Sequence, residues 1–206
     1  MKRQLFVGTI AMVCLAGAAQ AQITGSPHDF SSNAWSGGEI CKPCHTPHFA
    51  NFAAGRLWNH ALSDATYTMF EGDLEGSDHL DQDSVLCMGC HDGTVALDSF
   101  GGTTGQNFIN SGKMVGTDLR DDHPIGADAV YPTSPSTRFN PQDANHRVPG
   151  PWGSLSLRSW IDPSDNTEKW AVSCRTCHNV HNAGNHNAML YFSNQASHVC
   201  LTCHIK

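Results

Sequence analysis

The sequence predicts a mostly irregular, loop-rich fold with a few short helices and minor β-hairpins. Its 206 residues include 19 Gly and 10 Pro, residue types that interrupt helices and strands. Only 39% of the residues are hydrophobic, which leaves few apolar side chains to build a core. The pattern Cys-x-x-Cys-His also occurs four times. We therefore expect short local units, joined by loops and short helices, to organise the chain.

The N-terminus has the three parts of a secretory signal peptide. Met1, Lys2 and Arg3 give a basic start, residues 5–19 are almost entirely apolar, and residues 19–21 form the small-x-small cleavage site Ala-Gln-Ala. The apolar run is shorter than the roughly 20 residues that a membrane-spanning helix needs, and no later segment is long and apolar enough. We therefore expect removal of residues 1–21 and export, either to the periplasm or to the cell surface.

Cys-x-x-Cys-His is the attachment motif of c-type haem, and its four copies are numbered here as motifs 1 to 4. Two thiols one short turn apart can add to the two vinyl groups of a haem, and the next imidazole reaches the iron from the same face. We expect four covalently attached haem c groups, held by Cys41, Cys44, Cys87, Cys90, Cys174, Cys177, Cys200 and Cys203. The proximal iron ligands are then His45, His91, His178 and His204.

Paired cysteines in an exported protein ordinarily indicate disulfides, and Cys-x-x-Cys pairs also occur in zinc sites. Both interpretations are disfavoured, because histidine follows every pair at once. The motifs use all nine cysteines except Cys14, which lies in the signal peptide. We therefore expect residues 22–206 to form a single tetrahaem domain wrapped around four haems, which supply much of its apolar core. Without haem we expect no stable fold, as in small metal-dependent domains.

The formal net charge is −7 at pH 7. This balance argues against nucleic acid or anionic lipid as a partner, because both repel an acidic protein. Basic redox proteins and cationic metal species suit the charge better.

Regular elements are expected at few places outside the motifs. Apolar residues show some helical spacing over residues 51–70, and a short helix over residues 84–90 would deliver motif 2. The long interval between motifs 2 and 3 is rich in Gly, Pro, Asp and Ser, and short β-hairpins are expected within it around residues 94–100 and 113–120. Residues 168–172 are expected to form a strand that leads into motif 3.

Nine histidines outside the motifs are candidates for the sixth, distal position on the irons. His48 and His181 each follow a proximal histidine by three residues, and this shared offset favours a shared role. His28 lies shortly before motif 1, and His123 precedes a proline in the long interval. His60 is the reserve candidate. The other four have no comparable context: His79, His146, His186 and His198.

Several segments together resemble a family of exported tetrahaem c-type cytochromes that polymerise into extracellular filaments, or nanowires. The resemblance covers most of the mature chain and lies in residues 26–31, 41–48, 57–60, 90–94, 122–126 and 200–204. It implies distal ligands at His28, His48, His123 and His181, which match the histidines that recur outside the haem motifs of such sequences. It also implies that each subunit donates a histidine, best matched by His48, to a haem of its neighbour.

The resemblance implies long-range electron transfer through a head-to-tail homopolymer. Such a filament delivers respiratory electrons to other cytochromes and to extracellular acceptors such as metal oxides. Two imidazoles on each iron leave no open position for a substrate, so we expect an electron-transfer protein and not an enzyme. Two alternatives stay open. The same haems would suit a soluble periplasmic electron shuttle, and an iron with a vacant position would suit a haem-dependent reductase.

Overall fold

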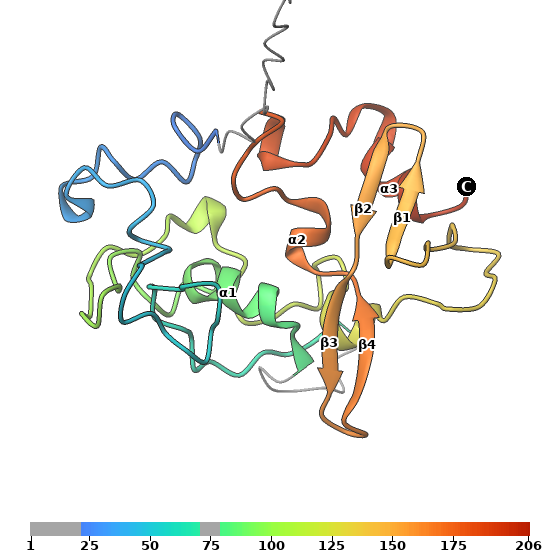
Figure 1. Cartoon of the computed structure of the whole chain (residues 1–206), viewed down its shortest axis with the longest axis horizontal. Helices are drawn as coiled ribbons and strands as arrows, with labels where there is room; N and C mark the ends of the chain where they lie inside the picture. Colours follow the sequence, from blue (N-terminus) through green and yellow to red (C-terminus); the bar gives the residue numbers. More distant parts are fainter. Residues whose placement is uncertain (1–21, 71–78) are drawn as a thin grey trace, which may run out of the picture.

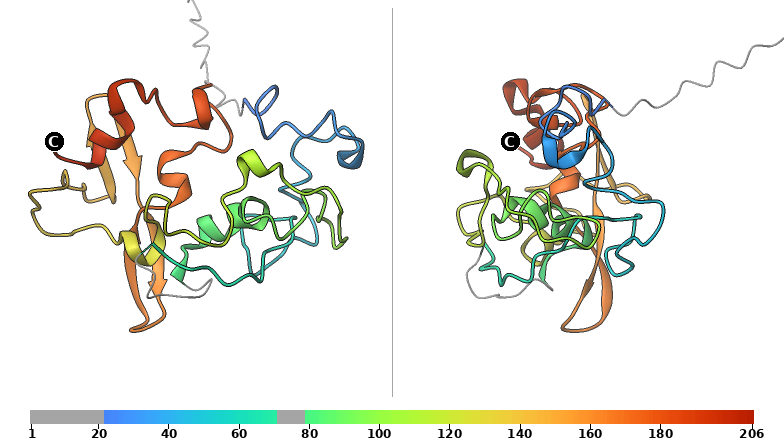
Figure 2. Two further views of the ribbon diagram at one scale, coloured as in Figure 1. Left: turned by 180° about the vertical axis from the view of Figure 1, so that it is seen from behind. Right: turned by 90° about the vertical axis from the view of Figure 1, so that its left-hand side faces the viewer.

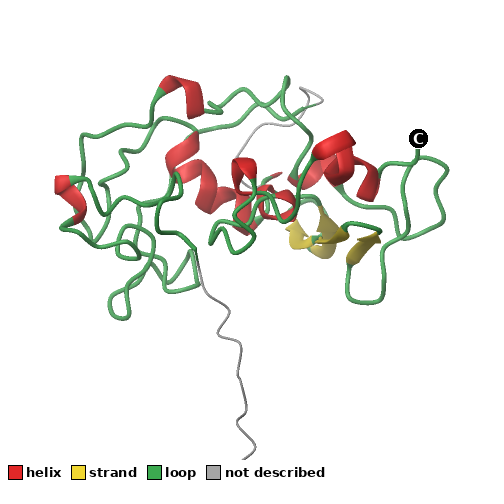
Figure 3. Cartoon of the chain, turned by 90° about the horizontal axis from the view of Figure 1, so that it is seen from above, coloured by secondary structure: helices red, strands yellow, loops and turns green. Residues whose placement is uncertain are grey.

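The computed structural model describes residues 22–70 and 79–206. The signal peptide expected over residues 1–21 lies outside the described residues. Loops and turns make up most of the described chain, as the sequence predicted (Figure 3). None of the helices in these two ranges is long and apolar enough to cross a membrane.

Within the described ranges, the regular elements are short, and all of the strands and α-helices except α1 lie in the second half of the chain (Figure 1). The α-helices are α1 (Gln82–His91), α2 (Cys174–Cys177) and α3 (His198–Cys203). The strands are β1 (Arg147–Gly150), β2 (Gly153–Ser156), β3 (Arg158–Asp162) and β4 (Thr167–Ala171). Short 3-10 turns lie at Ala34–Ser36, Ser111–Lys113, Gly126–Ala129, Asn187–Met189 and Gln195–Ser197.

The helix predicted over residues 84–90 is confirmed as α1, and it begins two residues earlier. Its start is fixed by the carboxylate of Asp81, which accepts the backbone N–H groups of Asp83 and Ser84 at 3.0 Å each. Such a cap satisfies donors that have no partner within the helix. After the helix, Gly93 adopts a φ of +79°, which turns the chain away. The helix therefore ends on motif 2.

The first turns of α1 and α2 are joined by buried hydroxyl groups. The backbone N–H of Cys174 donates to Ser84 Oγ at 3.2 Å, and Ser84 Oγ lies 3.3 Å from Ser173 Oγ. Ser173 and Thr176 also form a capping box, in which the side chain of each residue accepts the backbone N–H of the other. This box stabilises the first turn of α2. Motifs 2 and 3 are consequently held side by side, although 82 residues lie between His91 and Cys174 in the sequence.

Two antiparallel hairpins make up the sheet structure. Strand β1 pairs with β2 from Arg147↔Ser156 to Gly150↔Gly153, and β3 pairs with β4 from Arg158↔Ala171 to Asp162↔Thr167. The strand predicted over residues 168–172 is confirmed as β4. The hairpin partner of β4 and the β1–β2 hairpin were not predicted.

The hairpins predicted around residues 94–100 and 113–120 are wrong. These segments contain turns and isolated bridges instead of paired strands. The carboxylate of Asp98 accepts the backbone N–H groups of Gln106 and Asn107 at 2.9 and 2.8 Å. A side chain therefore takes the donors that a strand ladder would have used.

The helical spacing seen in residues 51–70 does not produce a helix. Arg56 and Leu57 have φ values of +51° and +53°, outside the right-handed helical region. Backbone groups of this segment pair with motif 1 instead, since Asn59 N–H donates to Cys44 O at 2.9 Å. The segment thus lies alongside the first motif as an irregular strap.

Two small apolar clusters stand on either side of the α1–α2 contact. One lies at α3 and the β1–β2 hairpin and contains Tyr131, Val148, Leu155, Leu157, Phe192, Val199 and Cys203. The other packs beside α1 and contains Tyr67, Met69, Leu80, Met88 and Leu119. Figures 1 and 2 show the corresponding N-terminal part, blue to green, beside the C-terminal part, orange to red. The polypeptide therefore has two modest cores of its own.

Candidate functional site

Each Cys-x-x-Cys-His motif forms one helical turn. In motifs 1, 3 and 4 the histidine N–H donates to the carbonyl oxygen of the first cysteine, at 2.8, 3.0 and 2.9 Å. Motif 2 is the last turn of α1. A bond from residue i to residue i−4 closes an α-helical turn, so both thiols and the imidazole start from the same turn. This is the local geometry that attachment of one haem requires.

The eight described cysteines are free thiols in varied surroundings. Burial raises the pKa of Cys44 to about 11, and it raises the pKa of Cys90 and Cys177 to about 12. The second cysteine of motifs 1, 2 and 3 is therefore a neutral thiol surrounded largely by protein.

The thiols of successive motifs lie next to one another. After burial, the next cause of the raised pKa of Cys90 is the charge of Cys44. Hydrogen bonding between Cys87 and Cys174 is the main cause that raises the pKa of Cys87 and lowers that of Cys174. In motif 3, the charges of Cys203 and Cys200 follow burial in raising the pKa of Cys177. Motif 1 therefore adjoins motif 2, motif 2 adjoins motif 3, and motif 3 adjoins motif 4.

Three proximal histidines each lie opposite a histidine from a distant segment. The ring centroids of His28 and His91 are 6.2 Å apart, those of His45 and His181 are 6.3 Å apart, and those of His123 and His204 are 6.2 Å apart. Burial lowers the pKa of His28, His181 and His204, and the facing histidine lowers it further in each case. The neutral imidazole, the form that binds metal, is therefore favoured at His28, His181 and His204.

These separations fit one iron held between two imidazoles. A metal bonded to both rings at about 2 Å per bond would place the ring centroids about 6 Å apart. Three pairs reach this separation independently, and each contains the histidine of a Cys-x-x-Cys-His motif. The residues present therefore fit haem iron with two histidine ligands at motifs 1, 2 and 4.

Backbone carbonyl groups orient most of these imidazoles. A ring Nδ1 lies within hydrogen-bond distance of a carbonyl oxygen in His45 (Arg56, 3.0 Å), His91 (Lys113, 2.9 Å), His178 (Ala188, 2.8 Å) and His123 (Pro124, 2.8 Å). A carbonyl can only accept, so Nδ1 carries the proton and Nε2 is left to bind a metal. Such a bond to the second nitrogen is the usual support of a metal-binding histidine.

Each facing histidine lies nearer in sequence to another motif than to the one that it faces. His28 precedes motif 1 but faces His91 of motif 2, and His181 follows motif 3 but faces His45 of motif 1. His123 lies between motifs 2 and 3 and faces His204 of motif 4. Each of these candidate iron sites therefore joins segments that are remote in sequence.

His178 of motif 3 differs from the other proximal histidines. Its ring is exposed. No histidine ring of the described residues lies opposite it at the separation of 6.2–6.3 Å seen in the three pairs. Its Nδ1 bond to Ala188 nevertheless orients the ring in the same way. This motif has a prepared proximal ligand and takes no distal histidine from the described part of its own chain.

The remaining sequence candidates, His48 and His60, lie apart from the three pairs. His60 is buried, with Nδ1 2.8 Å from Ala61 O and Nε2 3.0 Å from Ala96 O, so both ring nitrogens face carbonyl groups. This geometry gives no support to His60 as a reserve ligand. His48 is exposed, and the neighbouring Phe49 and Phe52 are fully exposed, at 104% and 99%.

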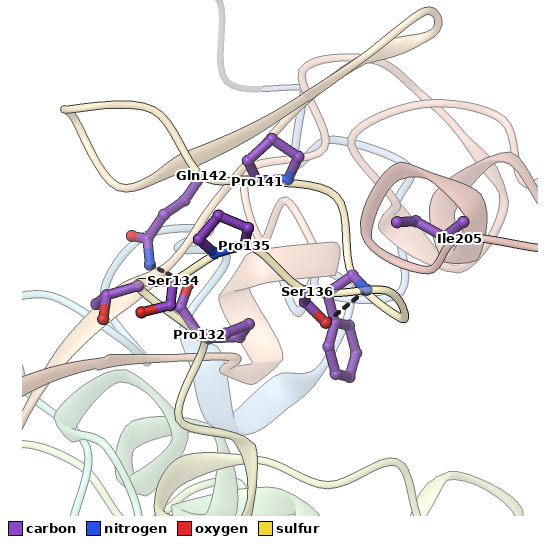
Figure 4. A pocket seen from close by; sticks show the side chains of 9 residues that line it. Pro132, Ser134, Pro135, Ser136, Pro141, Gln142 and Ile205 are labelled. Atoms are coloured by element: carbon purple, nitrogen blue, oxygen red, sulfur yellow. Dashed lines mark hydrogen bonds between the residues drawn. The ribbon is translucent and has the colours of Figure 1, made fainter.

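A pocket of about 310 Å³ lies near motif 4 (Figure 4). Phe139 forms part of its wall and lies 5.0 Å from the ring of His204, measured between centroids. The other lining residues are largely apolar or small: Pro132, Thr133, Ser134, Pro135, Ser136, Pro141, Gln142 and Ile205. An apolar wall next to a proximal histidine suits the face or edge of a porphyrin.

Comparison with protein families supports the assignment of the motifs. Residues 168–206 match the family model described as the doubled CXXCH motif. This match indicates a multihaem c-type cytochrome. No curated protein matches the chain. The matched residues include motifs 3 and 4, and motifs 1 and 2 repeat the same pattern at residues 41–45 and 87–91.

One feature beside the motifs of the cytochrome was not predicted from the sequence. The buried carboxylate of Asp83 is contacted by Arg56, Arg158 and Arg175. These residues come from four separate segments, and their spacing in sequence gives no signal that they meet.

Proposed function

We propose that the cytochrome carries electrons over long distances through four haem c groups, arranged in the order of their motifs. The observation that carries this proposal is the recurrence of histidine pairs at 6.2–6.3 Å, one at each of motifs 1, 2 and 4. Haem iron, when bound, supplies a centre that alternates between ferric and ferrous states. The polypeptide holds such centres in succession and sets their surroundings.

Paired imidazoles favour electron transfer over catalysis at these sites. An iron bound by four porphyrin nitrogens and two histidines has no position left for a substrate. His45, His91 and His204 each have a facing histidine within their own chain. These three sites therefore fit electron transfer without bond formation to a substrate, and we propose that the protein is not an enzyme.

The contacts between motifs support a linear route. Electrostatic interactions link the thiols of Cys44 and Cys90 and those of Cys177 and motif 4, and a hydrogen bond links Cys87 to Cys174. Because every haem would be attached through these thiols, the attachment points of consecutive porphyrins are neighbours in the structure. Motif 1 and motif 4 are then the first and last sites of this series within one subunit.

We further propose that His48 of one subunit ligates the iron at His178 of the next. The two residues repeat a relation seen within the subunit. His181 stands three residues after a proximal histidine and reaches His45 of another motif. His48 stands three residues after His45, is exposed, and has no such counterpart in the described chain. One copy thus presents His48, a histidine without a facing partner, and the next copy presents His178, a proximal histidine without a distal one.

Phe49 and Phe52 support the same contact. Two fully exposed phenyl rings beside one histidine are unusual on a surface that meets only water. Burial of both rings against a second copy would add about 3–6 kcal/mol of apolar stabilisation before the costs of association. A head-to-tail contact of this kind joins different surfaces and generates a filament when the rotation does not close.

The resulting proposal is an extracellular filament that delivers respiratory electrons to other cytochromes and to external acceptors such as metal oxides. Cryo-electron microscopy of material sheared from the cell surface, stained for haem peroxidase activity, tests it. We expect filaments of this chain in which density for His48 joins the iron at His178 of the neighbouring subunit. His48→Ala should abolish filaments, whereas His186→Ala, at another histidine outside the motifs, should leave them intact.

Two results would contradict the filament. Material found only as periplasmic monomers would establish the soluble shuttle instead. Filaments that persist in His48→Ala would exclude the bridging ligand.

A second candidate function follows from His178 alone. If no neighbour supplies a ligand, the iron at motif 3 has an open position, as a haem-dependent reductase requires. Reduction of small nitrogen or sulfur oxyanions by the purified monomer, lost on filament assembly, would support this reading.

A further inference from the structure

Asp83 is the centre of a cluster of charges that the haem motifs themselves do not explain. Its carboxylate is only 3% exposed and lies 2.7 Å from Arg56 Nη2 and 3.0 Å from Arg175 Nη1. Arg158 Nε lies 3.4 Å away, and this atom is buried without a hydrogen bond in the described structure. We call Asp83 and its three arginines the Asp83 cluster.

The Asp83 cluster has more positive than negative charge. Three guanidinium groups face one carboxylate, so the cluster carries a net charge of +2. Asp81 also interacts electrostatically with Asp83, and burial raises the pKa of Asp81. Even with Asp81 counted as ionised, the local sum stays at +1. The cluster is therefore locally positive, whereas the whole chain has a formal net charge of −7.

The cluster lies where motifs 2 and 3 meet. The backbone carbonyl oxygen of Asp83 accepts a hydrogen bond from the thiol of Cys87, in motif 2, at 3.3 Å. Arg175 is itself a residue of motif 3. The thiols of Cys87 and Cys174 interact directly across this junction. Arg56 extends the cluster to motif 1, because its carbonyl oxygen is the partner of His45 Nδ1.

Fixed positive charge next to a haem favours the state with one more electron. The ferrous haem is more negative than the ferric haem by one unit, so a nearby cation stabilises it and raises the reduction potential. The effect is strongest where solvent screens least, and the side chains of Arg158 and Arg175 are each only 23% exposed. Arg56 is 49% exposed and is screened more.

We propose that the Asp83 cluster raises the reduction potentials of the haems at motifs 2 and 3 above those of the haem at motif 4. Asp83 is the positioning residue that holds the arginines in place, and the arginines supply the charge. This inference rests on the proposed attachment of four haems. It makes the middle of the route more favourable for an electron than the end at motif 4.

The test uses the full-length secreted protein with its haems attached. Haem content by intact mass comes first, since fewer than four haems would contradict the proposed function and not this inference. Reduction is then followed optically while the potential is stepped. We expect Arg175→Gln to shift two of the four one-electron steps to lower potential. Arg158→Gln, outside every motif, should shift the same steps by less.

Two further variants separate charge from shape. Arg175→Lys keeps the charge and should restore most of the wild-type titration. Lys169→Gln removes a cation that pairs with Asp162 and Asp165 on the β3–β4 hairpin, and it should leave all four steps unchanged. The inference is overturned if Arg175→Gln and Arg158→Gln both titrate as wild type. It is also overturned if Arg175→Lys shifts the steps as far as Arg175→Gln.

Discussion

Replacement of His123 by alanine should open one iron of the cytochrome and change little else. The ring of His123 lies 6.2 Å from that of His204, the proposed proximal ligand at motif 4. Alanine ends at Cβ and cannot reach a metal that stands between the two rings. The iron at His204 then has one protein ligand, becomes high-spin, and binds carbon monoxide when reduced.

The fold should survive this change. His123 is exposed, and its one side-chain hydrogen bond goes to the adjacent Pro124 O at 2.8 Å. Apart from the lost iron bond, removal of such a side chain costs on the order of 0.5–1 kcal/mol. The signal is therefore a change in ligation at one haem of four, and not a general loss of structure.

Carbon monoxide titration of the reduced protein gives the stoichiometry directly. His123→Ala should bind one more carbon monoxide per chain than the wild type, and added imidazole should reverse the change. The matched control is His146→Ala, because His146 stacks on Trp170 at 3.8 Å and faces no proximal histidine. The reasoning is refuted if His123→Ala binds no more carbon monoxide than the wild type, or if His146→Ala gains as much.

Three further predictions concern the polypeptide around the haems. Leu155→Ala should lower the free energy of unfolding by about 2–5 kcal/mol in urea titrations, because Leu155 is fully buried in the apolar cluster at α3 and the β1–β2 hairpin. An effect below about 1 kcal/mol would contradict that packing. Tyr67→Phe should cost about 1.5–3 kcal/mol by the same measurement, since the buried hydroxyl donates to the Asp92 carboxylate at 2.7 Å; Tyr67→Phe with unchanged stability would show that this bond contributes nothing. Burial raises the pKa of Asp81 above 3.8, so the folded state holds this proton more tightly than the unfolded state; the stability that results is complete below the unfolded pKa and is lost as pH rises through the native pKa. Asp81→Asn should flatten this part of the pH dependence, and an unchanged slope of stability against pH would count against it.

Local chemistry was the part of the site that the sequence could predict. The Cys-x-x-Cys-His spacing specifies its own geometry, since the histidine N–H to cysteine O bond closes within five residues. The short helix before motif 2 and the strand before motif 3 were predicted for a similar reason. Both are local elements with a clear start and end.

Long-range relations could not be predicted in the same way. His28 precedes motif 1, yet it lies opposite His91 of motif 2, and nothing in the spacing indicates this crossing. The hairpins of residues 147–171 were missed although Leu155 and Leu157 alternate with polar residues, a period-2 signal that Gly and Pro nearby obscured. The Asp83 cluster depends entirely on tertiary contacts. Sequence patterns thus identified candidate ligands, and the fold shows which of their rings lie opposite one another.

We propose that three irons each take both histidines from one chain and that the fourth takes His48 from a neighbour. Electron paramagnetic resonance of the ferric protein tests it, with monomers and filaments measured side by side. Monomers should show three low-spin haems and one haem without a second histidine, and filaments should show four low-spin haems. Monomers in which all four haems are already low-spin with two histidines would contradict the claim, because motif 3 would then have found its ligand within the chain.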